Sequence, residues 1–187
     1  ALERIHRVVR LLGESPYPDR TLSLRYAFVH VLYQQALADE TGLTRRASLS
    51  LALARSLERH HGTNSTAGAA EIACLYESGR DYAGAARHFQ LAAQNAAHVF
   101  AHRDAIILAK RGLDLLEAVP ASPERDELEL SLQMHLGLQI QVTEGYAADL
   151  AKQSYARARA LFPAAENSKR LFAILWGQWL YYKVRSR

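Results

Sequence analysis

The chain has 187 residues, of which 49% are hydrophobic and 22% are charged, and its formal net charge is +4. These proportions are ordinary for a globular protein, and a mild positive charge without a concentrated basic stripe does not indicate a particular partner. Because Cys74 is the only cysteine and no apolar run approaches the roughly 18 residues that cross a bilayer, the sequence excludes an internal disulfide and predicts a cytoplasmic protein with no membrane partner.

The first segment predicts an amphipathic helix. In residues 2–12, apolar side chains recur at helical spacing, while Arg4, Arg7 and Arg10 share another face. Gly13 is expected to end this helix. The segment begins abruptly in the middle of this pattern, so we expect the chain to be part of something longer.

The next segments predict one strand and two helices. Residues 13–18 contain the glycine and prolines of a loop, and the alternating stretch 21–28 predicts the only strand. Helices are expected at 29–40 and 43–60, and Thr44 is a candidate N-cap of the second.

A polar break at 62–66 predicts a boundary between two domains, residues 1–61 and residues 66–187. The second domain is expected to be all-helical. Ser122 before Pro123 is a strong start signal, because serine caps free amides and proline suits the first helical turn. Glycines and prolines divide this domain into six helices in three hairpins, at 66–78, 81–98, 102–118, 123–142, 147–162 and 167–185.

One segment of that domain has the period of a strand. Apolar residues alternate strictly from Leu128 to Val142, but strands rarely exceed about 8 residues, so its length favours a helix. As a helix, it carries one apolar ridge through Leu128 and Leu132 and another through Leu130 and Met134, on opposite sides. We therefore expect an inner helix that is buried on both sides.

Two segments have the residue spacing with which stacked helical hairpins pack. The packing residues are Tyr82, Ala85, Phe89 and Ala92 in one segment and Ala151, Tyr155 and Ala158 in the other. A large ring fills the gap between helices, and small residues one turn away allow close approach. The spacing resembles tetratricopeptide repeats and predicts an irregular, tetratricopeptide-like α-solenoid, against the alternative of another alanine-rich helical bundle.

The chain also resembles a larger architecture. The colinear segments that carry the resemblance are YAFVHVLYQQAL (26–37), LTRRASLSLALARSLERHHG (43–62), residues 73–120, LGLQIQVTEGYA (136–147), SYARARALF (154–162) and LFAILWGQWLYY (171–182). Together they look like the region downstream of the ATPase core in bacterial regulatory ATPases of the STAND class, which are fused to cyclase, kinase or transcription-factor modules.

The resemblance implies that residues 1–61 are the tail of a winged-helix domain with its connecting helices, including a wing strand or hairpin. It also implies that residues 66–187 are the first tetratricopeptide-like hairpins of a longer sensor array. The chain contains no GxxxxGK[ST] phosphate-binding loop, so we expect no nucleotide hydrolysis here, whatever the parent protein does.

The sequence offers little support for a catalytic or metal-binding site. His98 and His102 are four residues apart, but no third metal ligand is nearby in the sequence. No serine or cysteine has the setting of a catalytic nucleophile. We therefore predict neither enzymatic activity nor a cofactor.

An aromatic group near the end of the chain is the best candidate for a partner surface. Phe172, Trp176 and Trp179 fall on one helical face, and Tyr182 continues that face one turn further. Such side chains anchor partners in protein interfaces. The alternative is that they pack within the helical array.

These observations predict a non-catalytic interaction or sensor segment of a bacterial signal-transduction ATPase or transcriptional regulator. Its partner would be a protein, either its own ATPase core or a regulatory partner, with a small-molecule effector as a further candidate. The alternative is a nucleic-acid-binding regulator that uses Arg4, Arg7 and Arg10 next to the wing, although a winged helix needs earlier helices for this.

Overall fold

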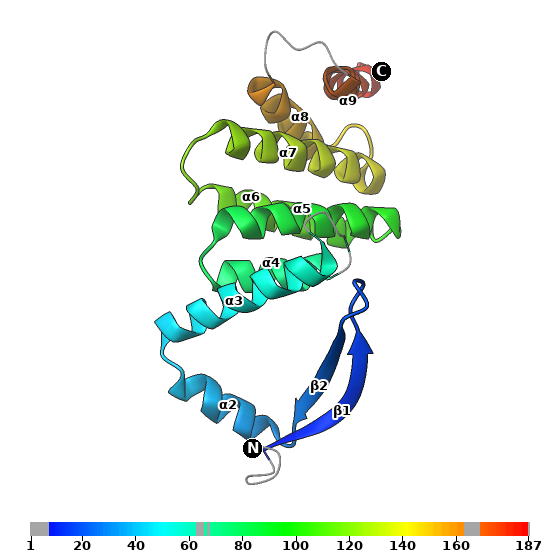
Figure 1. Ribbon diagram of the computed structural model, residues 1–187. Coiled ribbons are helices and arrows are strands. Elements are labelled where there is room, and N and C mark those ends of the chain that lie inside the picture. Colours follow the sequence, from blue (N-terminus) through cyan, green and yellow to red (C-terminus); the bar gives the residue numbers. More distant parts are fainter. Residues whose placement is uncertain (1–7, 63–65, 67, 163–168, 187) are drawn as a thin grey trace.

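The computed structural model describes residues 8–62, 66, 68–162 and 169–186. Within them the chain is mostly helical, and Figure 1 shows the helices stacked one on the next, with a β-hairpin at one end and α9 at the other. The elements are β1 (Val9–Pro16), β2 (Leu22–Phe28), α2 (Val31–Glu40), α3 (Leu43–His61), α4 (Ala69–Ser78), α5 (Tyr82–His98), α6 (His102–Leu116), α7 (Pro123–Glu144), α8 (Asp149–Leu161) and α9 (Lys169–Arg185).

The N-terminal helix predicted for residues 2–12 is wrong where the structure describes it, because β1 begins at Val9. Residues 1–7 lie outside the described residues. β1 pairs antiparallel with β2, and the register is interrupted at Gly13, whose φ of 143° suits glycine. Gly13 is therefore at a bulge inside a strand, and 21–28 is not the only strand. The predicted loop over 13–18 is correspondingly confined to the turn after Pro16.

The tip of the hairpin rests on the end of α3. The Tyr17 ring stacks on the His60 ring with 4.7 Å between centroids, and Asp19 Oδ2 lies 2.7 Å from His60 Nδ1. Hydrogen bonds from His60 and from the Thr21 backbone lower the pKa of Asp19 to about 2. This contact joins the hairpin to the helical stack.

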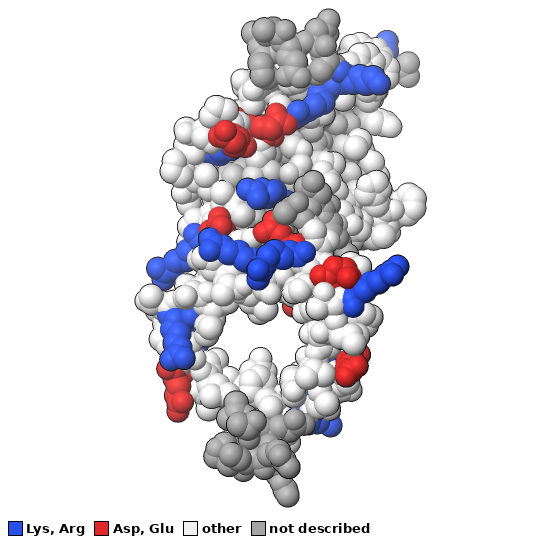
Figure 2. Space-filling view, viewed as in Figure 1, with Lys and Arg blue, Asp and Glu red and all other residues white. Residues whose placement is uncertain are grey.

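The N-terminal layer is thinly packed. None of the residues of α2 is buried, and large apolar side chains of β2 such as Leu24 and Tyr26 are half exposed. Figure 2 shows an opening between this layer and α3. On the same face, basic side chains gather around the level of α3 with acidic side chains close beside them, so the charges of the two signs are mixed.

The helical core is built from alanine paired with a few large side chains. One cluster joins α3, α4 and α5 around Phe89, and a second joins α5 to α8 around Leu132 and Leu136. A Cβ at Gly112 would lie 3.3 Å from Phe89 Cβ, so α5 and α6 approach closely there. No helix in the described parts of the chain has the length and hydropathy of a bilayer span.

The alternating segment is a helix, α7, as its length predicted. Leu132, Leu136 and Ile140 are buried on the side of α6, while Leu130 joins a third cluster with α8 and α9. The expectation of burial along both ridges is only half right, because Leu138 is 49% exposed. Figure 1 shows α9 beyond α8 at the end of the stack, and the second ridge is covered only over its first turns.

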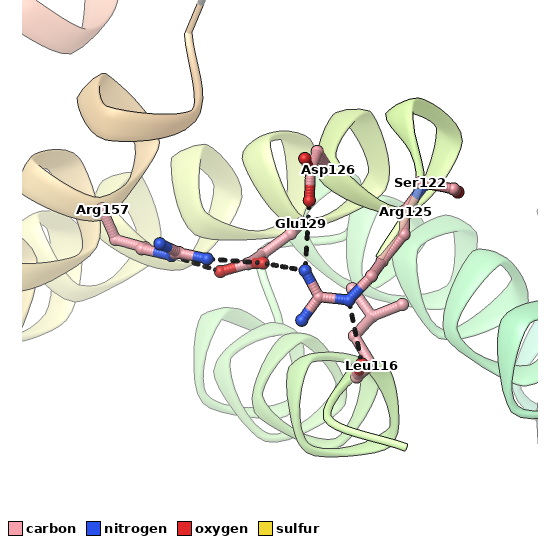
Figure 3. Close-up of polar contacts among 6 residues, drawn as sticks. All are labelled: Leu116, Ser122, Arg125, Asp126, Glu129 and Arg157. Atoms are coloured by element: carbon pink, nitrogen blue, oxygen red, sulfur yellow. Dashed lines mark hydrogen bonds and ion pairs between the residues drawn. The ribbon is translucent and has the colours of Figure 1, made fainter. Parts of the chain in front are cut away.

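The start of α7 is fixed by the predicted cap and by an ion-pair cluster (Figure 3). The Arg125 amide donates to Ser122 Oγ at 3.2 Å, and Pro123 occupies the first turn. Thr44, by contrast, is not a cap, since α3 begins with Gly42 in that position.

Glu129 connects three helices through two arginines. It accepts hydrogen bonds from Arg125 at 3.0 Å and from Arg157 of α8 at 2.5 and 3.0 Å. Arg125 also donates to the Leu116 carbonyl at the end of α6, at 3.1 Å. The hydrogen bond from Arg157 is the main cause that lowers the pKa of Glu129.

We predict that Phe89→Ala lowers the free energy of unfolding by about 3–5 kcal/mol, because it removes a buried ring. Tyr82→Ala should cost only about 1 kcal/mol, since Tyr82 is half-buried and lies outside the core clusters. Urea unfolding of both variants checks this. Equal losses would contradict the assigned core.

We predict that Glu129→Gln costs about 1–3 kcal/mol at neutral pH, because charge-assisted hydrogen bonds are lost. A carboxyl group whose pKa is lowered by folding stabilises the protein at pH values above the ordinary pKa of the group, 4.5. This contribution is lost progressively as the pH falls below 4.5. The variant should therefore lose less stability than the wild type below about pH 4.5. Glu144→Gln, exposed at the other end of the same helix, is the control. An unchanged dependence of stability on acid pH for Glu129→Gln would contradict the prediction.

Candidate interaction surface

The predicted packing residues of α8 lie at the centre of the last three helices. Ala151, Tyr155 and Ala158 are all buried. Ala151 belongs to the cluster shared with α7, and Ala158 to the cluster shared with α9. One face of α8 therefore contacts both neighbours, and small residues permit this approach.

Tyr155 fills the space between α7 and α9. A Cβ at Gly137 would lie 3.0 Å from its Cε2 atom, and a Cβ at Gly177 would lie 2.5 Å from its Cζ atom. The Gly177 distance is too short for a real Cβ contact and the Gly137 distance is tighter than most, so the ring occupies space that these glycines leave free. The ring thus fixes how close α7, α8 and α9 lie to one another.

The polar end of Tyr155 is tied into the same junction. Its hydroxyl donates to Gln141 Oε1 at 3.1 Å, and Gln141 Nε2 donates to the Gly177 carbonyl at 3.1 Å. Burial raises the pKa of Tyr155 to about 12, so the hydroxyl stays protonated and remains a donor at neutral pH. We call Tyr155, Gln141, Gly137 and Gly177 the Tyr155 junction.

A second set of contacts holds the end of α9. The Tyr181 hydroxyl donates to Asp149 Oδ1 at 2.5 Å, and Arg185 donates to the same oxygen at 2.9 Å. Lys152 lies over the Tyr181 ring, 5.1 Å from its centroid. The Tyr181 hydrogen bond, followed by the charge of Arg185, lowers the pKa of Asp149, and the same hydrogen bond raises the pKa of Tyr181.

The opposite face of α9 exposes the predicted aromatic residues. Phe172 and Trp176 stack with 5.9 Å between ring centroids, and Trp176 and Trp179 stack with 4.8 Å. Their exposed fractions are 66%, 48% and 48%, and Tyr182 is 57% exposed. We call these four residues the aromatic stripe. Rings gathered on one exposed face are typical of an interaction site.

A pocket opens between the aromatic stripe and α7. Its volume is about 360 Å³. Met134 and Leu138 of α7, Tyr146 of the α7–α8 connection, and Phe172 and Trp176 of α9 contribute to its walls. The Tyr155 junction contributes Tyr155, Gln141 and Gly177 to the same lining. We call this the α7–α9 pocket.

The other predicted packing residues lie elsewhere, on α5. Ala85 and Phe89 are buried in the cluster that joins α3, α4 and α5, Ala92 is buried outside the clusters, and Tyr82 is half-buried. The buried ring beside Gly84 is that of Tyr76. These residues build the stack and do not touch the α7–α9 pocket.

A second polar cluster, formed by Glu58, Tyr76 and His88, lies between α3, α4 and α5. Tyr76 donates a hydrogen bond to Glu58, and His88 Nε2 lies 3.7 Å from Glu58 Oε1. Burial, followed by the bond to Glu58, raises the pKa of Tyr76 to about 12. His88 is 1% exposed, whereas the Glu58 side chain is 14% exposed, so solvent reaches only the carboxylate end of this cluster. Within the described residues, no group of three or more His, Cys, Asp or Glu is arranged to hold a metal ion.

Sequence reasoning missed Gly137, Gln141, Tyr146 and Gly177. The only signal was the presence of isolated glycines inside helical patterns, which indicates close packing but does not name the neighbour. The ring that needs both glycines comes from a third helix, so the pairing is visible only in three dimensions.

Comparisons with family models, with curated protein sequences and with solved structures give no match. The resemblance to the ATPase-associated array therefore stays a prediction.

We predict that Gly177→Ala lowers the free energy of unfolding by about 1–3 kcal/mol, because the new methyl group overlaps the Tyr155 ring. In a Tyr155→Leu background the same substitution should cost less, since the ring is gone. A double-mutant cycle from urea unfolding measures this coupling. Additive losses would contradict the junction.

Proposed function

We propose that this chain is a non-catalytic interaction segment, and that its binding surface is the aromatic stripe of α9 together with the α7–α9 pocket. The observation that carries the proposal is the row of stacked, half-exposed rings beside a pocket on a helix whose other face is fixed. Large, rigid aromatic side chains contribute much of the binding energy of an interface, and they lose little conformational entropy on binding.

The arrangement around the stripe supports binding. Ile174, Gly177 and Tyr181 hold α9 through its buried face, so the exposed rings are presented by a helix that is already positioned. Such preorganisation reduces the ordering cost of association. Tyr155 of α8 also contacts both α7 and α9. Binding of a partner at the stripe would therefore affect how α7, α8 and α9 pack.

A binding role also agrees with where the polar clusters lie. The cluster of Glu58, Tyr76 and His88 combines groups that serve in acid–base chemistry, but it is enclosed by α3, α4 and α5. The carboxylate Glu129 is already bonded to two arginines. Both carboxylates are therefore engaged in contacts between helices.

We further propose that the segment belongs to a bacterial regulatory ATPase, as a tetratricopeptide-like sensor array beside a winged-helix tail. The support is the sequence resemblance, the stacked helices and the hairpin at the N-terminal end (Figure 1). In this role, a partner or effector at α9 would bias how the helices pack, and the array would pass that bias to the ATPase core.

The alternative, a nucleic-acid-binding regulator, rested on three arginines that share one helical face. Arg10 lies on β1, so it does not share a helical face with Arg4 and Arg7, which lie outside the described residues. Among the described residues, no specific observation favours it.

We predict that a photo-reactive residue at Leu175, which is exposed next to the stripe, forms a discrete crosslinked product in extracts of cells that express the chain. The same residue at Ala156, exposed on α8, is the matched control and should not form it. Trp179→Ala should remove the product, because it removes a central ring of the stripe. A product that forms equally from both positions, or survives this substitution, would contradict the proposed surface.

A further inference from the structure

The α7–α9 pocket has the size of a small-molecule site. Its volume of about 360 Å³ falls in the range of ligand pockets, about 300–1,000 Å³. An apolar cavity of about 150 Å³ holds one benzene ring. By this comparison, the pocket accommodates a molecule of about two rings. This inference rests on the proposed function and names the ligand class of the same surface.

The lining disfavours a charged group inside the pocket. All ten residues that line the pocket are uncharged, and they include Met134, Leu138, Phe172, Trp176 and Leu180. A charged group placed among them would lose hydration without gaining a counter-charge. The lining therefore favours a neutral molecule.

The walls favour rings. Phe172 and Trp176 line the pocket and already stack on each other, with 20° between their planes. Tyr146 adds a third ring from outside the helices. Offset stacking and edge contacts with such rings add to simple area burial. A flat aromatic molecule makes more of these contacts than a branched aliphatic one.

The polar groups of the lining residues are those of Gln141, Tyr155, Tyr146 and Trp176. Gln141 Nε2 uses one of its hydrogens on the Gly177 carbonyl and has a second, and the Tyr155 hydroxyl keeps acceptor capacity after donating to Gln141. These two groups belong to the Tyr155 junction, which holds them in place. They offer a ligand one or two hydrogen bonds, which matches a single hydroxyl, amine or carbonyl group.

We propose that the α7–α9 pocket binds a neutral, flat, aromatic small molecule of about two rings that carries one or two hydrogen-bonding groups. Its rings lie against Trp176 and Phe172, and its polar group faces Gln141 and Tyr155. Because Tyr155 and Gln141 also position α9, a ligand bound in the pocket stabilises the position of α9 and of the aromatic stripe on it.

The test uses a matched pair of two-ring fluorescent probes on the full chain, 1-naphthylamine and its sulfonated counterpart 4-amino-1-naphthalenesulfonate. The chain has two tryptophans, and only Trp176 lines the pocket. In the Trp179→Phe variant, Trp176 is the sole donor, so energy transfer to the probe reports binding next to the pocket. The expected result is saturable transfer to the neutral probe, with at least tenfold weaker binding of the sulfonated one.

Two variants assign the transfer to the pocket. Ala173→Phe, made in the Trp179→Phe chain, fills the pocket from an exposed position and should weaken neutral-probe binding at least tenfold. Ala156→Phe adds the same ring on α8 and should leave binding unchanged. Tyr146→Ala removes a wall outside any helix and serves as an independent check should the Ala173 variant fail to fold by circular dichroism.

The inference is overturned if the filled pocket still binds the neutral probe, if the sulfonated probe binds as tightly, or if no saturable transfer occurs. The crosslinking at Leu175 separates this failure from that of the proposed function. A stripe that crosslinks while the pocket takes no neutral probe would leave a protein-binding surface without a small-molecule site.

Discussion

The Tyr155 ring sits where three helices meet, and the packing of the last part of the chain depends on it. Gly137 of α7 and Gly177 of α9 leave the space that the ring occupies, and Gln141 ties its hydroxyl to the α9 backbone. A hydrogen bond alone would give a net of about 1 kcal/mol. The combination of shape and hydrogen bonding sets both the distance and the orientation of α9, and with them the presentation of the aromatic stripe.

The same arrangement, a large side chain packed against a small residue of a neighbouring helix, recurs along the stack and explains the alanine-rich composition. Tyr76 lies against Gly84, and Leu132 and the Cβ of Phe89 lie against Gly112, so large side chains repeatedly meet glycine on a neighbouring helix. Small residues let backbones approach, and one ring fills the remaining gap to the density of a protein interior. The aromatic stripe departs from this rule, because its rings face outwards. That departure supports a binding role for α9.

The sequence predicted the helical part well, because its signals are local. The capping pair Ser122 and Pro123 marks a helix start without knowledge of the rest of the fold, and the aromatic stripe follows from residue spacing alone. The failures depend on distant partners. Gly13 looked like a helix end but is a bulge, because the strand that pairs with it follows the turn. Gln141 and Gly177 gained a role only through Tyr155 on another helix.

The central claim is that the Tyr155 junction holds α9 and its exposed surface in place. Hydrogen exchange followed by mass spectrometry on the wild type and on Tyr155→Ala tests it most directly. The account predicts that amides of Lys169–Arg185 exchange faster in the variant, while amides of α4, α5 and α6 keep their protection. Wild-type protection of α9 in the variant, or an equal loss along the whole stack, would contradict the account.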